Sequence, residues 1–244
     1  MTALRILIVT LLLLSTAGRS SAQIDLDEIE AATGRAMIER MKKSAGECTS
    51  HFIAELDGKL FGALMARKTI VRPPEIHIFN LAKINAFAVP SGKIVLTAAL
   101  LATLRSSDEY AAVMLHELGH VALGHNRKNM IVEAARSLLF GSDAIKLPVL
   151  LARLKYSRTQ EEEADEFAAK AMLKLGIPPA SLANALLRIS TSASLSAKSD
   201  LFSTHPLTND RVKVLNGYRR ETKVAGPAIV FPAWRGIDLT CKQL

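Results

Sequence analysis

Two histidines and a glutamate near the middle of the chain have the spacing of a metal site. Residues 116–120 read His-Glu-Leu-Gly-His, inside a stretch from Asp108 to Gly124 whose capping residue, apolar spacing and final glycine predict a helix. His116 and His120, four residues apart, project from one side of that helix and can share an ion. Glu117 lies beside them, where it can act as a general base on water. The alternative is a solvated helix with two unrelated histidines.

This arrangement is typical of zincins, which place zinc between the two histidines and use the glutamate in peptide hydrolysis. A catalytic zinc also needs a third protein ligand and an open position. Glu161 and Asp165 are candidates, because residues four apart on a helix predicted to start at Ser157 or Thr159 face one direction. An exposed acidic run is the alternative. It is the interpretation adopted for Glu162, Glu163 and Glu166, and we expect Glu162 and Glu163 to point away from the site.

The surrounding pattern predicts helices on either side of a short β region. Extended segments are expected at 75–80, 84–89 and 93–96, with a turn at 90–92. Helices are expected at 25–43, at 47–67 with a break or bend near Gly58, and from Thr97. Further helices are expected at 108–124, from Ser157 or Thr159 to 175, at 181–190 and at 209–220. Residues 138–154 are interpreted as a loop with a short helix, 190–199 as a loop, and the tail from Gly226 as extended. The expected fold is α+β: mainly helical, with a small, mostly antiparallel sheet beside the His-Glu helix.

The first 22 residues have the pattern of a secretory signal peptide. Arg5 precedes a short apolar run at 6–14, and small and polar residues follow up to Ala22. A membrane anchor is the alternative, but the run is shorter than the ~20 residues that span a bilayer. We expect cleavage after Ala22, a periplasmic or secreted location, and a single zinc metallopeptidase domain at 23–244.

The composition is that of a folded globular protein with a basic surface. The net charge of +8 falls to +6 if residues 1–22, with their two arginines, are removed. The basic residues are scattered and no nucleic-acid motif is present, so we expect no nucleic-acid partner. A basic surface does permit peripheral association with anionic membranes.

Cys48 and Cys241 are the two cysteines of the sequence. Export would place them where disulfides persist, and an extended tail otherwise has little to hold it. We expect a disulfide between them; the alternative is two free thiols.

Four segments, in order, resemble the zinc metallopeptidases that include HtpX-like and CAAX-prenyl-protease-like enzymes. Residues 85–92, Asn-Ala-Phe-Ala-Val-Pro-Ser-Gly, are similar to that family's edge-strand signature, although Ser91 replaces a usual glycine. The other three are the metal motif at 116–120, Ser157-Arg158 with the acidic pair after it, and Ser203-Thr204-His205-Pro206 with a later arginine. Together they cover about residues 75 to 215.

The resemblance implies a role for each matching residue. Glu161 would be the third ligand of one zinc ion per chain, and Asp165 the partner of a ligating histidine. His205 and Arg211 would lie near the open zinc position. Many relatives are multi-pass membrane enzymes, but this chain is similar to the small soluble periplasmic kind. Protein quality control in the cell envelope would then be the expected role. An extended substrate is expected to pair with the edge strand through the backbone of Asn85, Ala86, Phe87 and Ala88.

The sequence thus predicts a zinc metalloendopeptidase acting on proteins or peptides. The alternative is a chaperone-like or scaffold protein with a structural zinc. Structural zinc is usually closed by cysteine or histidine and has no use for a glutamate beside it, which favours the enzyme.

Overall fold

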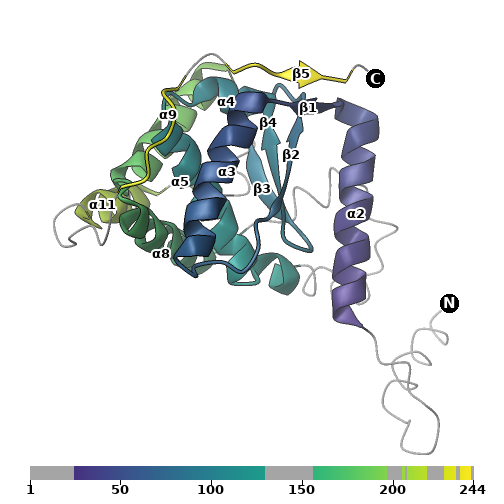
Figure 1. Cartoon of the computed structure of the whole chain (residues 1–244), viewed down its shortest axis with the longest axis horizontal. Helices are drawn as coiled ribbons and strands as arrows, with labels where there is room; N and C mark the ends of the chain where they lie inside the picture. The colour runs from purple at the N-terminus through teal and green to yellow at the C-terminus, as the bar shows by residue number, and fades with distance from the viewer. Residues whose placement is uncertain are drawn as a thin grey trace, which may run out of the picture.

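The computed structural model describes residues 25–129, 156–196, 205–206, 208–218, 228–234 and 237–242. The signal peptide expected at 1–22 and the loop expected at 138–154 lie outside these ranges. Within them the chain is a mainly helical α+β structure built around one sheet, as the sequence predicts (Figure 1). Among the described residues, no helix combines the length and the apolarity needed to span a bilayer.

The sheet has five strands in the order β3-β4-β2-β1-β5. β2 and β4 run parallel, and the other neighbouring pairs are antiparallel, so the predicted mostly antiparallel sheet is confirmed. β3 lies at one edge, where it pairs with β4. The strands are β1 (Glu47–Thr49), β2 (Glu75–Phe79), β3 (Ala86–Val89), β4 (Lys93–Thr97) and β5 (Thr240–Cys241).

The segment expected to begin a helix at residue 47 is instead the strand β1, and that prediction is wrong for its first turn. β1 pairs with β2 on one side and with β5 on the other, so tertiary pairing overrides the local helical pattern. The helix starts at His51, where the Ser50 side chain accepts a hydrogen bond from the Ile53 amide at 3.1 Å. Cys48 and Cys241 are register partners and form the expected disulfide.

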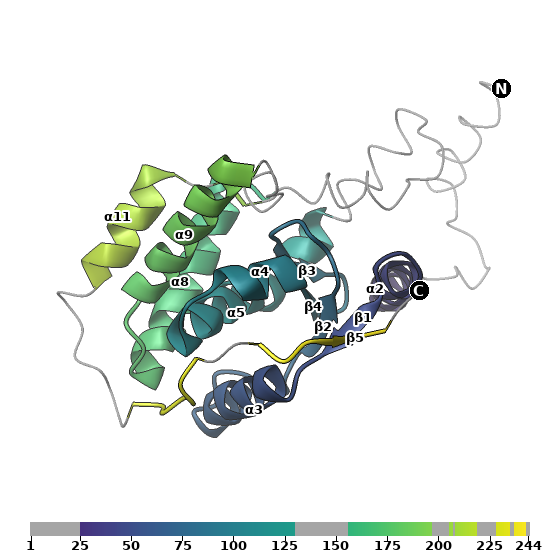
Figure 2. The ribbon, with the colours of Figure 1, turned by 90° about the horizontal axis from the view of Figure 1, so that it is seen from above.

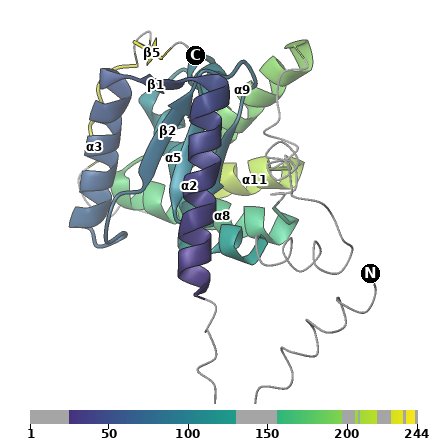
Figure 3. The same ribbon diagram turned by 90° about the vertical axis from the view of Figure 1, so that its right-hand side faces the viewer.

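Helices cover both faces of the sheet. α2 lies along one face, where Met37, Ile38 and Met41 pack against a group that includes Phe87 and Val95 (Figure 3). α3, α5 and the helices behind them lie on the other face (Figure 2). The helices are α2 (Leu26–Ala45), α3 (His51–Ala66), α4 (Ala98–Thr103), α5 (Ser107–Ala122), α8 (Arg158–Leu175), α9 (Ala180–Ser196) and α11 (Asn209–Gly217).

Two helix predictions are wrong in their details. α3 is continuous through Gly58, so the helix is not broken there. α9 runs to Ser196 through the segment expected to be a loop. Alanine favours helix, and the Thr191 hydroxyl donates to the Leu187 carbonyl at 3.0 Å instead of competing for a turn.

In the turn between β3 and β4, a serine adopts a conformation that favours glycine. Ser91 has φ 70° and Gly92 φ 77°, both in the left-handed region that glycine occupies most easily. The Ser91 amide donates to Glu30 Oε1 of α2 at 3.0 Å. This contact holds the turn in the glycine-like conformation.

Candidate metal and active site

The site is built where α5 and α8 cross at close range. A Cβ placed on Gly119 would lie 3.1 Å from the Cα and the carbonyl oxygen of Ala164, so any larger residue would crowd the backbone of α8 and glycine favours this approach. α8 begins with a capping box between Ser157 and Gln160 and ends at Gly176, in left-handed conformation with φ 75°. These signals set where along α8 the acidic residues lie.

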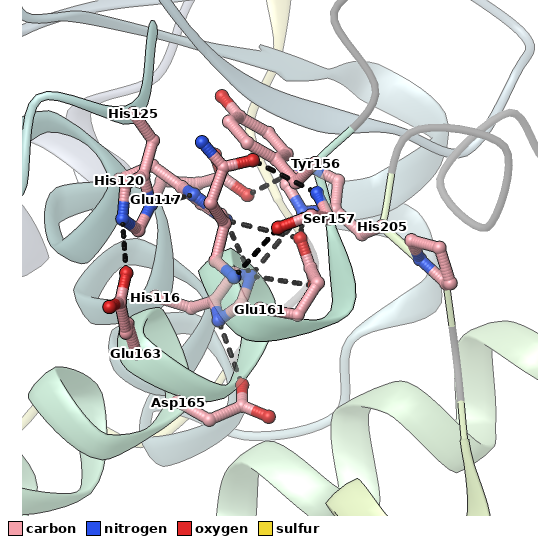
Figure 4. Close-up of polar contacts among 12 residues, drawn as sticks. His116, Glu117, His120, His125, Tyr156, Ser157, Glu161, Glu163, Asp165 and His205 are labelled. Carbon is pink, nitrogen blue, oxygen red and sulfur yellow. Dashed lines mark hydrogen bonds and ion pairs between the residues drawn. The ribbon is translucent and has the colours of Figure 1, made fainter. Parts of the chain in front are cut away.

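The crossing brings three predicted ligands together in the interior. His116 Nε2 and His120 Nε2 are 3.2 Å apart, and Glu161 Oε1 lies 3.3 Å from the latter. Glu161 Oε2 lies 3.5 Å from His116 Nε2. With His205 these residues offer ligand atoms that all lie within 4.8 Å of one another, and all four are buried (Figure 4).

The donor atoms of this cluster fit a divalent cation. Asp165 Oδ1 lies 2.9 Å from His116 Nδ1, so in the neutral imidazole that nitrogen carries the proton and Nε2 presents a lone pair. The Nε2 lone pair then faces the Glu161 carboxylate, an acceptor as well. Buried acceptors that face one another need a cation between them. Two imidazoles and one carboxylate form the donor set of a catalytic zinc site.

The protonation behaviour of the cluster also indicates a site that attracts positive charge. Burial alone would lower the pKa of His116, but hydrogen bonds and charges of Asp165 and Glu161 raise that pKa to about 10. Burial would raise the pKa of Glu161, but the charge of His205 and hydrogen bonds from three histidines hold it well below its ordinary value. For His120, burial lowers the pKa well below the usual range.

Asp165 and Arg211 form a buried pair behind the cluster. Arg211 Nε and Nη2 donate to the two Asp165 oxygens at 2.7 and 2.8 Å. Arg211 Nη1 lies 2.6 Å from Glu161 Oε2 and donates to the Pro206 carbonyl at 3.0 Å. The guanidinium therefore contacts both carboxylates and the His-Pro segment.

Glu117 and His205 face each other across the cluster. His205 Nε2 lies 3.6 Å from Glu117 Oε1, and its Nδ1 lies 3.0 Å from Glu161 Oε1 and 3.4 Å from His116 Nε2. Glu117 is 1% exposed, and its Oε2 has no hydrogen-bond partner among the described residues. A buried carboxylate oxygen without a partner is costly and suits a group that awaits a reactant.

The four residues expected to bind substrate belong to or precede β3. Ala86, Phe87 and Ala88 are in the strand, with buried side chains, and Asn85 immediately precedes it. The Asn85 carbonyl accepts from the Thr97 amide at 3.1 Å, which joins it to the β4 side. β3 also packs against α5, the helix that carries the histidines.

The sequence interpretation missed His125 and Tyr156, and it misplaced Glu163. His125 is 0% exposed, with Nδ1 2.9 Å from His120 Nδ1 and Nε2 2.9 Å from Glu163 Oε2. The expectation that Glu163 points away is therefore wrong, because the chain turns after α5 and places His125 beside it. Tyr156 stacks on the His120 ring with centroids 3.6 Å apart. The available signal was a third histidine five residues after the motif, just beyond a glycine.

The fold and the cluster together define a zincin-like active-site architecture, and comparison with known proteins gives the family. The model of peptidase family M48 matches residues 59–219. The chain belongs to this family.

The chain is also similar to named proteases from several organisms. It is 30% identical to metalloprotease LoiP of Escherichia coli over 58% of this chain and 61% of that protein. It is 24% identical to a beta-barrel assembly-enhancing protease of Yersinia pestis over 79% of this chain and 44% of that protein. It is 30% identical to mitochondrial metalloendopeptidase OMA1 of Arabidopsis thaliana over 58% of this chain and 30% of that protein. The chain spans less than two thirds of each relative's length.

Proposed function

We propose that this protein is a zinc-dependent metalloendopeptidase. The observation that carries the proposal is Glu117, a buried carboxylate with a free oxygen, beside the convergent donors His116, His120 and Glu161. When bound, zinc lowers the pKa of a coordinated water and polarises the scissile carbonyl. Glu117 accepts the proton from water and delivers it to the leaving amine.

The other buried groups position these residues. Asp165 holds Nδ1 of His116 and thereby directs Nε2 to the ion, and Arg211 holds Asp165 and Glu161 in place. His205 lies within reach of the ligand atoms and of Glu117, at the position expected to be open to substrate.

The substrate in this proposal is an extended protein or peptide segment. β3 is an edge strand beside the helix of the histidines, and among the described strands it pairs with β4 alone. An edge strand recognises extended backbone through main-chain hydrogen bonds with little dependence on side chains. Asn85 to Ala88 would form this recognition strand.

We also propose export and a role in envelope protein quality control. The leader-like first 22 residues and the Cys48–Cys241 disulfide support an oxidising compartment. A relative named as a beta-barrel assembly-enhancing protease supports the envelope role. Peripheral membrane association through the basic surface is part of this proposal.

Separation of chemistry from metal binding tests the enzyme proposal. Glu117→Gln removes the base and leaves the donor set, so the purified variant should keep one zinc per chain and lose most casein cleavage. Glu161→Gln weakens a ligand and should lower both the zinc content and the rate of casein cleavage. Glu162→Gln, an exposed neighbour, serves as the matched control. If Glu117→Gln cleaves casein like the wild type, Glu117 is not the base and the proposed mechanism is wrong. If the zinc-loaded wild type cleaves no casein, the chaperone-like or scaffold alternative with a structural zinc gains support instead.

A further inference from the structure

The two histidines of the metal motif differ in what stands behind them. His116 Nδ1 faces the carboxylate of Asp165 directly. His120 Nδ1 instead faces Nδ1 of His125 at 2.9 Å, and His125 Nε2 faces Oε2 of Glu163 at 2.9 Å (Figure 4). His120 therefore reaches a carboxylate through an intervening imidazole.

A glycine brings His125 into this place. α5 ends at Ala122, and Gly124 adopts φ 66°, a left-handed conformation that reverses the chain direction. The next residue, His125, is fully buried, and its ring lies against that of His120. Its sequence distance of five from His120 would place the two on different sides of an uninterrupted helix, so the contact depends on the turn.

Glu163 determines which nitrogen of each ring carries the proton. An ionised carboxylate only accepts, so His125 Nε2 must be the donor to it. In an imidazole with one proton, that proton then lies on Nε2, and Nδ1 of His125 is an acceptor. The partner nitrogen, Nδ1 of His120, must then donate, and its Nε2 is left with the lone pair. The opposite arrangement would place a proton on His120 Nε2 and remove it from the donor set.

A second contact fixes the plane of the same ring. Tyr156 stacks on His120 at a centroid distance of 3.6 Å and an interplanar angle of 20°. Its hydroxyl donates to the side chain of Asn126, the residue next to His125. Nδ1 of His120 is thus held by His125, and the face of its ring by Tyr156. His125 belongs to the segment after Gly124, and Tyr156 is hydrogen-bonded to that segment.

We propose that His125 and Glu163 are positioning residues for the metal: the chain Glu163–His125–His120 sets the tautomer and aim of His120. The inference rests on the proposed metal site and adds a second supporting pathway to that of Asp165. Partners that orient ligating histidines in this way typically change metal affinity by about 10–100-fold. Glu163 is half exposed, with a side chain 49% accessible, so its own effect should lie at the lower end of that range.

The test compares zinc affinities of the full-length protein by competition with a chromophoric chelator. The variants are Glu163→Ala, Glu163→Gln and Glu163→Lys, with Glu162→Ala and Glu162→Lys as neighbours of equal charge change and no contact with His125. Glu163→Ala should weaken zinc binding about tenfold. Glu163→Gln should restore most of the affinity, because its amide oxygen can accept from His125. Glu163→Lys should weaken binding at least as much as Glu163→Ala, whereas both Glu162 variants should match the wild type.

Folding is checked by thermal unfolding of each metal-free protein. Because the Glu163 side chain is half exposed, its removal leaves no cavity in the core, and equal melting temperatures for Glu163→Ala and Glu162→Ala show that the fold is intact. Equal zinc affinities for that pair overturn the inference. His116→Ala separates this failure from failure of the metal site: if it retains zinc as well as the wild type does, the proposed function itself is wrong.

Discussion

Asp165→Asn tests how much the metal depends on residues behind the ligands. The carboxylate receives two hydrogen bonds from Arg211, at 2.7 and 2.8 Å, and lies 2.9 Å from His116 Nδ1. An amide keeps one oxygen, so its NH₂ group must face a donor of Arg211 or His116. A hydrogen bond to a charged group contributes about 1.5–3 kcal/mol, and loss of the bond that fixes His116 should weaken zinc binding about 10–100-fold.

The assay is zinc competition with a chelating dye, followed by casein hydrolysis at saturating zinc. Because Asp165 acts through His116, saturating zinc should restore most of kcat. Glu166→Gln is the matched control, since Glu166 is exposed on the same helix and pairs at 2.6 Å with Lys170. Wild-type zinc affinity in Asp165→Asn would refute the reasoning. Weak hydrolysis at full zinc occupancy would show instead that Asp165 acts in the chemistry.

Three further predictions concern stability and access to the metal. Cys48→Ser with Cys241→Ser opens a crosslink of sequence separation 193 and should lower the free energy of unfolding by about 3–5 kcal/mol in denaturant titration; an unchanged midpoint and slope would contradict it. Burial raises the pKa of Asp57 to about 7, although the Tyr110 hydroxyl donates to it. The folded state thus favours the neutral acid and loses stability as pH rises from about 4 through 7. Asp57→Asn should therefore raise the melting temperature by about 5 °C at pH 8 and by less at pH 5. An equal gain at the two pH values would reject this linkage. His205→Ala should raise casein cleavage without loss of zinc, since His205 Nδ1 lies among the ligand atoms where substrate must enter; lower cleavage would indicate that it stabilises the oxyanion.

The sequence predicts those parts of the site that follow from helical geometry. His116 and His120 converge because they are four residues apart, and Glu161 and Asp165 share a face for the same reason. The capping residues of α8 are also readable, since Ser157 and Gly176 have strong local preferences. These local signals carried the main prediction about the site.

Features that depend on distant pairing were not predictable in the same way. β1 has a helical pattern and becomes a strand only because β2 and β5 lie beside it. His125 reaches His120 through a turn at Gly124, and the helical period gives no hint of that contact. Glu163 was misplaced for the same reason, because its partner, His125, follows the end of α5 and is not a residue of its own helix.

The contact between Gly119 and Ala164 has a consequence for the size of the ion that the site accepts. With no side chain between them, α5 and α8 meet backbone to backbone, so rotamer changes cannot widen the crossing. The spacing between the backbones of the His116–His120 turn and of Glu161 is then fixed by the contact between the two helices. Only the ligating side chains can adjust to an ion of another size.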